Sequence, residues 1–163
     1  MSGEQLALKK IAIVEQKAIY LTQPPDESNL LFVVNQRGII QIIKYDTPVT
    51  EPFLDISDRV LESKNEESKS GLLGLAFHPS YKKNGSFFLI YINKQNTFIV
   101  SRFSVTKNKE IAEKDSEKII LKLPRSNLDN ASGHLTFGPK DGFLYISFGD
   151  RSSSPGTTYN AQN

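Results

Sequence analysis

Apolar positions in this chain come in short runs that are separated by turn-forming residues. Residues 30–34 and 38–44 flank Asn-Gln-Arg, and residues 87–92 and 98–105 flank a second polar stretch. β-Branched and aromatic side chains dominate these runs, which is typical of strands rather than helices. Each pair of runs therefore predicts a β-hairpin.

A third hairpin is predicted near the C-terminal end of the sequence. Residues 134–137 and 143–148 flank Gly-Pro-Lys-Asp-Gly, and the pair Asp141-Gly142 is a strong turn signal because glycine tolerates a positive φ. Apolar residues alternate along both runs, so one face is expected to be buried. The residues on that face are Leu135, Phe137, Leu144, Ile146 and Phe148.

Residues 71–78 and 118–123 each predict a further strand, the second closed by Pro124. The polar stretches 62–70 and 107–118 predict solvated loops, the latter with room for one helical turn. Many short strands with turn punctuation indicate an all-β fold: a sandwich, a barrel or a propeller. A rough recurrence of a Gly-bounded strand followed by an aromatic-rich strand slightly favours the propeller.

Composition narrows the functional classes. The chain has 163 residues, 38% of them hydrophobic, which is enough for one domain with a real core. A net charge of +2 is too balanced to indicate a nucleic-acid partner or a membrane surface.

No run approaches the ~20 apolar residues of a membrane span. Charged residues interrupt the N-terminal apolar run, so it does not predict a signal peptide, and cysteine is absent.

Several stretches, in this order, resemble the soluble quinoprotein glucose/sorbosone dehydrogenase family. The resemblance runs from about Ala18 to the end of the sequence. It implies a six-bladed β-propeller that oxidises aldose sugars with pyrroloquinoline quinone (PQQ) and calcium. The chain is also similar to the propeller of the Hedgehog-interacting proteins, relatives that use it for binding. The matching stretches are LLFVVNQRGIIQII, PFLDISDRVL, SGLLGLAFHPSYKKNGSFFLIYI, VSRFSV, LTFGPKDGFLYISFGD and NAQN.

The resemblance also sets the expected domain organisation. A propeller blade takes roughly 40–50 residues, so 163 residues are too few for six blades. We therefore expect residues 1–17 to form an N-terminal segment and residues 18–163 an incomplete propeller domain, the N-terminal blades of the ring. The expected partners are the remaining blades and, by resemblance, a sugar substrate.

Four residues occupy positions that the resemblance assigns to the site. Asn130 stands where the family has the histidine that acts as general base, and Asp129 stands at the acidic position before it. A carboxamide cannot replace imidazole as a base, because it does not titrate near neutral pH. Lys69 stands where the family usually has Glu or Gln near the quinone, and Asp150 stands at an acidic position flanking the site. Asp150 could equally form an Asx-turn with its own backbone.

The two histidines of the chain have less specific interpretations. His134 lies four residues after Asn130, up to ~13 Å away in an extended chain. We expect it to be a half-exposed strand residue, although a displaced general base is the alternative. His78 follows an apolar strand. We expect it to be structural and to bond a backbone carbonyl, with a ligand contact as the alternative.

These residues predict the N-terminal part of a PQQ-dependent aldose sugar (glucose/sorbosone) dehydrogenase-like propeller that is not itself catalytically competent. The alternative is a non-catalytic propeller module that binds a sugar or a protein partner, so whether the parent protein is an enzyme stays open. PQQ and calcium are implied by the resemblance alone, and we do not expect this chain by itself to bind them. No residue is assigned as a metal ligand. The family is periplasmic or extracellular, which leaves the compartment of this chain open.

Overall fold

The computed structural model describes residues 7–14, 17–62, 70–125 and 132–149. These residues form three antiparallel sheets and one four-residue helix, α1 (Tyr81–Asn84). The first sheet follows the order of the sequence, with β5 pairing beside β4 on strand β3. Its strands are β1 (Ala18–Thr22), β2 (Leu31–Asn35), β3 (Ile39–Lys44), β4 (Thr47–Pro48) and β5 (Leu54–Asp55).

The second and third sheets also follow the order of the sequence. The second sheet has the order β6-β7-β8-β9, and the third is the hairpin β10-β11. Among the described residues no helix is long and apolar enough to cross a membrane. The strands are β6 (Leu72–Phe77), β7 (Ser86–Ile92), β8 (Thr97–Val105), β9 (Ala112–Pro124), β10 (Gly133–Phe137) and β11 (Leu144–Phe148).

All three predicted hairpins are confirmed: β2 pairs with β3, β7 with β8, and β10 with β11. In the last hairpin Leu135 lies opposite Ile146, as the alternation requires. Gly142 adopts the positive φ of 70° that the turn needs. The Asp141 carboxylate closes this turn by accepting a hydrogen bond from the backbone amide of Phe143 at 3.0 Å.

Strand β9 is longer than the sequence indicates. Residues 107–118 were expected to be a solvated loop, which is wrong from Ala112 onward, where β9 begins. The Ala112 amide donates to the carbonyl of Phe53 at 2.8 Å, which anchors the start of the strand on the first sheet. β9 is the last strand in the order of its sheet and its polar residues are mostly exposed, so hydrophobic periodicity does not reveal it.

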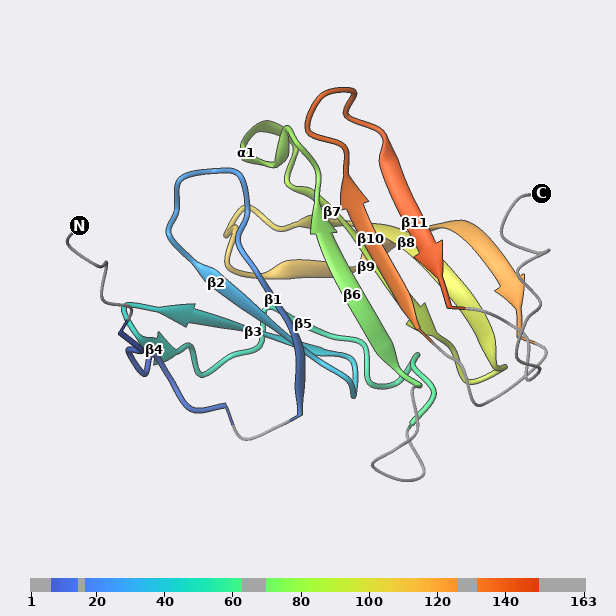
Figure 1. Cartoon of the computed structure of the whole chain (residues 1–163), viewed down its shortest axis with the longest axis horizontal. Helices are drawn as coiled ribbons and strands as arrows, with labels where there is room; N and C mark the ends of the chain where they lie inside the picture. Colours follow the sequence, from blue (N-terminus) through green and yellow to red (C-terminus); the bar gives the residue numbers. More distant parts are fainter. Residues whose placement is uncertain (1–6, 15–16, 63–69, 126–131, 150–163) are drawn as a thin grey trace, which may run out of the picture.

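The second sheet lies between the other two (Figure 1). One of its faces packs on the first sheet through a large apolar core, and the other packs on β10-β11 through a smaller one. Edge-to-face contacts such as Phe32 with Phe77, at 4.9 Å between ring centroids, join the first two sheets. Antiparallel sheets packed face to face in a row are the arrangement expected of propeller blades. The largest fully buried side chains are Tyr81, Phe32, Phe53, Phe87, Phe103, Ile40, Ile42, Ile56, Leu72, Leu75, Leu89 and Ile90.

A polar cluster also joins the first two sheets. Glu117 on β9 accepts hydrogen bonds from the hydroxyls of Tyr91 and Ser101, both at 2.7 Å, and from the Arg59 guanidinium at 2.6 Å. Arg59 belongs to the segment that follows β5, so it connects that segment to the outermost strand of the second sheet. Burial, together with the Glu117 carboxylate, raises the pKa of Tyr91 above its ordinary value of 10.0. The hydroxyl therefore stays protonated as a donor at neutral pH.

Candidate functional site

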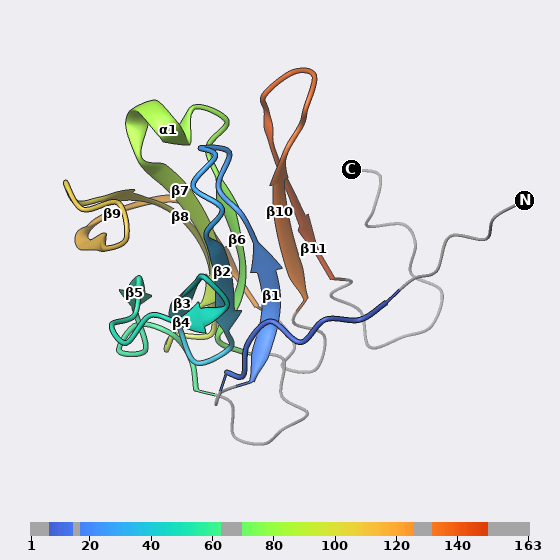
Figure 2. The ribbon, with the colours of Figure 1, turned by 90° about the vertical axis from the view of Figure 1, so that its left-hand side faces the viewer.

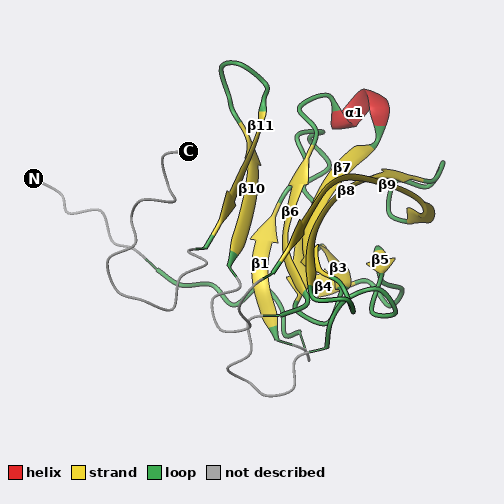
Figure 3. Cartoon of the chain, turned by 90° about the vertical axis from the view of Figure 1, so that its right-hand side faces the viewer, coloured by secondary structure: helices red, strands yellow, loops and turns green. Residues whose placement is uncertain are grey.

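The candidate site lies at the end of the molecule where β6 and β10 begin. These two strands run side by side in the same direction (Figure 3), with the start of β10 near Leu73 and its end near His78. The chain enters β6 from the segment that carries Lys69, and it enters β10 from the segment that carries Asp129 and Asn130. These three residues and Asp150 lie outside the described residues. The described frame of the site consists of the starts of β6 and β10 and the residues that contact them.

Gly71 fixes the entry into β6. Its backbone has φ +89°, and a Cβ atom there would lie 2.1 Å from the carbonyl oxygen of Gln36. That oxygen accepts a hydrogen bond from the Leu72 amide at 2.9 Å, and the Gln36 side chain donates to the carbonyl of Ser70 at 3.0 Å. The end of the first sheet and the start of the second are thus in direct backbone contact. The sequence indicated only a strand boundary at Gly71.

Gly133 plays the corresponding part at the entry into β10. A Cβ atom on Gly133 would lie 2.6 Å from the Cδ1 atom of Ile90, so β10 approaches the second sheet closely at this point. The Gly149 amide donates to the carbonyl of Ser132 at 2.8 Å. This bond joins the segment before β10 to the segment after β11. The first of these leads back to Asn130 in the sequence, and the second leads on to Asp150.

His134 is an exposed residue of β10, opposite Ser147 of β11. The prediction that it is a strand residue is confirmed. Its ring makes an edge-to-face contact with Tyr20 of β1, with 5.6 Å between ring centroids. Sequence reasoning missed Tyr20, because only the packing of the sheets brings β1 and β10 together. The pair places one imidazole and one phenol beside the starts of β6 and β10.

His78 lies at the opposite end of the second sheet, between β6 and α1 (Figure 2). Its Nδ1 atom accepts a hydrogen bond from the Ser80 amide at 2.9 Å and lies 3.0 Å from the Asn84 side-chain nitrogen. The expected structural role is therefore confirmed, but the expected partner is wrong: the ring bonds a backbone amide and not a carbonyl. The His78 ring thus accepts a hydrogen bond at the start of α1, a helix whose N-cap residue makes no side-chain hydrogen bond.

The described residues do not by themselves fit the calcium and quinone that the family resemblance implies. Among them no group of three or more His, Cys, Asp or Glu side chains could hold a metal ion. Calcium takes six to eight oxygen ligands, whereas the described frame contributes the His134 imidazole and the Tyr20 phenol.

Comparisons with known proteins agree with this fold. Residues 16–163 match the family model described as Glucose / Sorbosone dehydrogenase. The human Hedgehog-interacting protein is 32% identical over 136 residues, which are 77% of this chain and 19% of that protein. Quinoprotein glucose dehydrogenase B from Acinetobacter calcoaceticus is 32% identical over 94 residues, which are 52% of this chain and 19% of that protein. The chain thus spans about a fifth of the length of these curated relatives.

A solved structure has the same arrangement of strands. The PQQ-bound form of an aldose sugar dehydrogenase from Streptomyces coelicolor superposes with a TM-score of 0.72 at 19% sequence identity. The match covers 89% of this chain and 41% of that chain. The three sheets are therefore blades of a partial β-propeller, as the strand pattern and the resemblance predicted.

Proposed function

This chain belongs to the glucose/sorbosone dehydrogenase family, and from that premise we propose that it forms blades of a dehydrogenase-like propeller that binds a partner without oxidising a sugar. We place the propeller domain at residues 18–163. The observation that carries the proposal is Asn130, which stands where the family has its general-base histidine. Proton abstraction from a sugar hydroxyl needs a group that titrates near the operating pH, and a carboxamide does not.

The charge of Lys69 supports the same proposal. The family usually has Glu or Gln at this position near the quinone, and lysine brings a positive charge to it. A change of charge beside a cofactor alters the electrostatic environment in which its reaction takes place. Asn130 and Lys69 thus depart from the dehydrogenase pattern at two positions of one site.

The position of His134 in the sheet argues against a role as the general base. It sits within the β10-β11 ladder, with Gly133 and Leu135 on either side also paired to β11. Leu135 is 1% exposed and belongs to the core between β10 and the second sheet. His134 is therefore held within the strand, four positions after Asn130 in the sequence.

The extent of the sequence matches favours binding over oxidation. The match to the Hedgehog-interacting protein covers 77% of this chain, and the match to quinoprotein glucose dehydrogenase B covers 52%. The first relative is named for an interaction with a protein. A protein partner is accordingly the ligand class we propose, and oxidation of an aldose sugar with PQQ and calcium is the alternative that the second relative supports.

Sugar-dependent dye reduction, measured after the protein has been supplied with PQQ and calcium, tests the proposal. We expect little or no turnover by the wild-type protein. If the protein holds the quinone, Asn130→His should raise the rate by ~10²–10⁴-fold, the usual contribution of a general base. Lys69→Gln should raise it further where the charge disturbs the cofactor.

His134→Ala is the matched control and should leave the rate of Asn130→His unchanged. Fast turnover by the wild-type protein that is abolished by His134→Ala would assign the base to His134. That result would overturn the proposal in favour of an active sugar dehydrogenase.

A further inference from the structure

The β3-β4 hairpin presents an aromatic ring at its tip. Tyr45 and Asp46 are the two residues between these strands, and their φ angles are positive, 52° and 60°. Turns of this kind favour Asn, Asp and Gly, whereas a bulky side chain in the left-handed region is an outlier. Tyr45 is 91% exposed, so burial of its ring does not offset the strain. A strained position that adds nothing to the core points to a role outside the fold.

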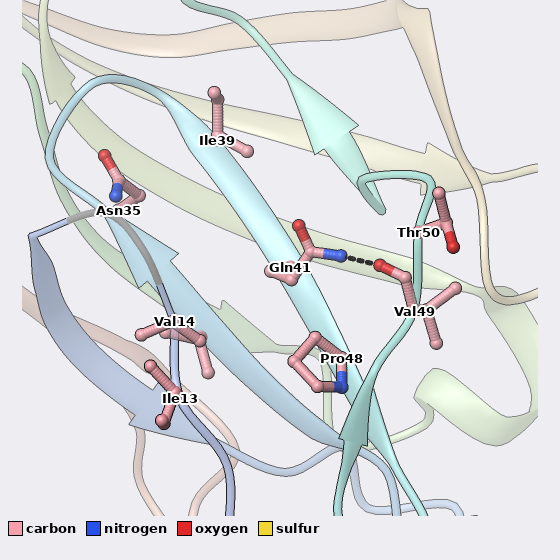
Figure 4. Close-up of a pocket in the computed structure, with 9 residues that line it drawn as sticks. Ile13, Val14, Asn35, Ile39, Gln41, Pro48, Val49 and Thr50 are labelled. Atoms are coloured by element: carbon pink, nitrogen blue, oxygen red, sulfur yellow. Dashed lines mark hydrogen bonds between the residues drawn. The ribbon is translucent and has the colours of Figure 1, made fainter.

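The backbone that carries Tyr45 is held in place. Gln41 of β3 donates from its side-chain amide to the carbonyl of Val49, just after β4 (Figure 4). Lys44, at the end of β3, forms an ion pair with Glu110 of the turn between β8 and β9. The ring is therefore presented from a fixed position, which lowers the entropy lost when a partner binds.

The β8-β9 turn lies beside this hairpin, because Glu110 holds Lys44. Its own hydrogen bonds make the turn rigid. The Asn108 side chain accepts from the Glu110 amide at 3.1 Å, and the Asn108 carbonyl accepts from the Ile111 amide at 3.0 Å. Ile111 is 43% exposed. Tyr45 and Ile111 thus adjoin the two members of one ion pair, and both expose apolar surface.

Positive charge borders these two side chains. Lys107 and Lys109 of the same turn are exposed, and among the described residues neither forms an ion pair with an acidic side chain. The Lys109 ammonium donates to the carbonyl of Lys82 at 2.8 Å, which orients it. Cations without an acidic partner around apolar side chains are complementary to an acidic ligand.

We infer that Tyr45 and Ile111 form the apolar centre of a docking surface for an acidic segment of a protein partner, with Lys107 and Lys109 as its charged rim. The inference rests on the proposed binding of a protein, to which it adds the surface and the chemistry of the partner. Both turns lie at strand ends, whereas propeller blades pack through their sheet faces. The β8-β9 turn lies at the end of the second sheet that carries α1, opposite to the candidate site.

A phage library of random dodecapeptides, selected on the immobilised 163-residue chain, is the probe. We expect the selected peptides to carry clustered Asp and Glu beside an apolar residue. No selected peptide, or selected peptides without an excess of acidic residues, would overturn the inference. The dye-reduction test does not involve these turns, so such a result leaves the proposed lack of sugar oxidation untouched.

The affinity of one selected peptide for variants of the chain locates the site, measured by fluorescence anisotropy. Tyr45→Ala should raise the dissociation constant at least about tenfold, as the truncation of a central interface residue does. The double variant Lys107→Gln and Lys109→Gln should weaken binding mainly at low salt. Phe143→Ala and Lys94→Gln remove an exposed ring and an exposed charge elsewhere, and both should bind like the wild-type chain. Equal affinities of the wild-type chain and Tyr45→Ala would overturn the inference.

A second measurement tests whether Tyr45 has a structural role instead. Asparagine tolerates the left-handed conformation, so Tyr45→Asn should raise the urea concentration at the midpoint of unfolding. A lower midpoint would show that the tyrosine stabilises its turn, and that result would also overturn the inference.

Discussion

At the scale of single residues, two glycines with positive φ offer a matched comparison. Gly71 (φ +89°) and Gly142 (φ +70°) both adopt a conformation that costs an L-residue about 1–2 kcal/mol. A Cβ atom on Gly142 would meet nothing within 4 Å, whereas one on Gly71 would lie 2.1 Å from the Gln36 carbonyl oxygen. Gly142→Ala should therefore lower the free energy of unfolding by about 1 kcal/mol.

Gly71→Ala should cost more than about 3 kcal/mol, because the clash also breaks the Leu72–Gln36 hydrogen bond. Urea denaturation followed by circular dichroism measures both variants. Equal losses for Gly71→Ala and Gly142→Ala would show that the close contact at Gly71 is not tight in solution.

The turn of the last hairpin carries a titratable group with a shifted pKa. The Tyr145 hydroxyl, and after it the Phe143 amide, hold the pKa of Asp141 below its ordinary value of 3.8. A carboxyl whose pKa is lower in the folded state stabilises the fold above its unfolded pKa, and this contribution is lost as pH falls through the folded value. Acidification should therefore weaken the β10-β11 turn as pH falls below 3.8 and through the lower folded pKa of Asp141.

The carboxyl carbon of Asp141, followed by NMR against pH, measures this shift directly. Tyr145→Phe removes the largest cause and should bring the pKa of Asp141 back toward 3.8. If the carboxyl of Asp141 titrated identically in the wild-type chain and in Tyr145→Phe, the hydrogen bond between Tyr145 and Asp141 would be absent in solution.

The sequence identified some site residues and could not identify others. The apolar neighbours of His134 indicated a strand position, and the alternation of Leu135 with Phe137 already gave its direction. The contact of His134 with Tyr20 joins residues more than a hundred positions apart, and no local pattern encodes it. The fit of Gly71 against Gln36 was hidden for the same reason, because it depends on how the first two sheets pack.

At the scale of secondary-structure elements, the predictable part of the fold was the part with apolar runs. The hairpin β10-β11 contributes one face to a core, so burial leaves a pattern of period two there, whereas β7 is buried on both faces and its apolar run is continuous. β9 contributes mostly polar residues, and its first half is stabilised by hydrogen bonds to the first sheet and to β8. Interactions of that kind leave no periodic trace in the sequence.

The Glu117 cluster should account for much of the stability of β9. Glu117→Ala leaves the Tyr91 and Ser101 hydroxyls and the Arg59 guanidinium without their shared acceptor. Hydrogen bonds to a charged group contribute about 1.5–3 kcal/mol, so we expect a loss of about 2–3 kcal/mol. Thermal or urea unfolding measures it.

Asp115→Ala is the control, because Asp115 meets the same Arg59 at 3.5 Å but its side chain is 92% exposed. Surface pairs of this kind contribute little, so the change should stay within about 0.5 kcal/mol. A loss as large as that of Glu117→Ala would mean that long-range charge, and not the buried cluster, stabilises β9.

At the scale of the whole molecule, the fold of the partial propeller is common to this chain and its relatives, whereas we propose that the side chains at the candidate site are specific to this chain. The shared part is the fold of the three sheets. In this chain Gly71 and Gly133 fix the entries into the second and third of them. The part that we propose is specific to this chain is the chemistry placed on that scaffold, with Asn130 and Lys69 at the positions that the resemblance assigns to a base and to a polar neighbour of the quinone. A propeller scaffold supports binding as readily as catalysis, so the fold alone does not assign the activity.

The last prediction concerns the cofactor. We expect the purified 163-residue chain to show no micromolar binding of PQQ in the presence of calcium. Among the described residues no group of three or more His, Cys, Asp or Glu side chains could hold a metal ion, and the fold match covers 41% of a PQQ-bound chain. We therefore expect that a complete cofactor site needs parts of the ring that this match does not reach. Titration of the chain with PQQ and calcium, followed by the absorbance of the quinone, measures the binding. Lys69→Gln serves as the companion variant, since it removes the charge that we propose disturbs the quinone site. Saturable micromolar binding by the wild-type chain, weakened or strengthened by Lys69→Gln, would show that these blades alone form a quinone site and would restore sugar oxidation as the leading function.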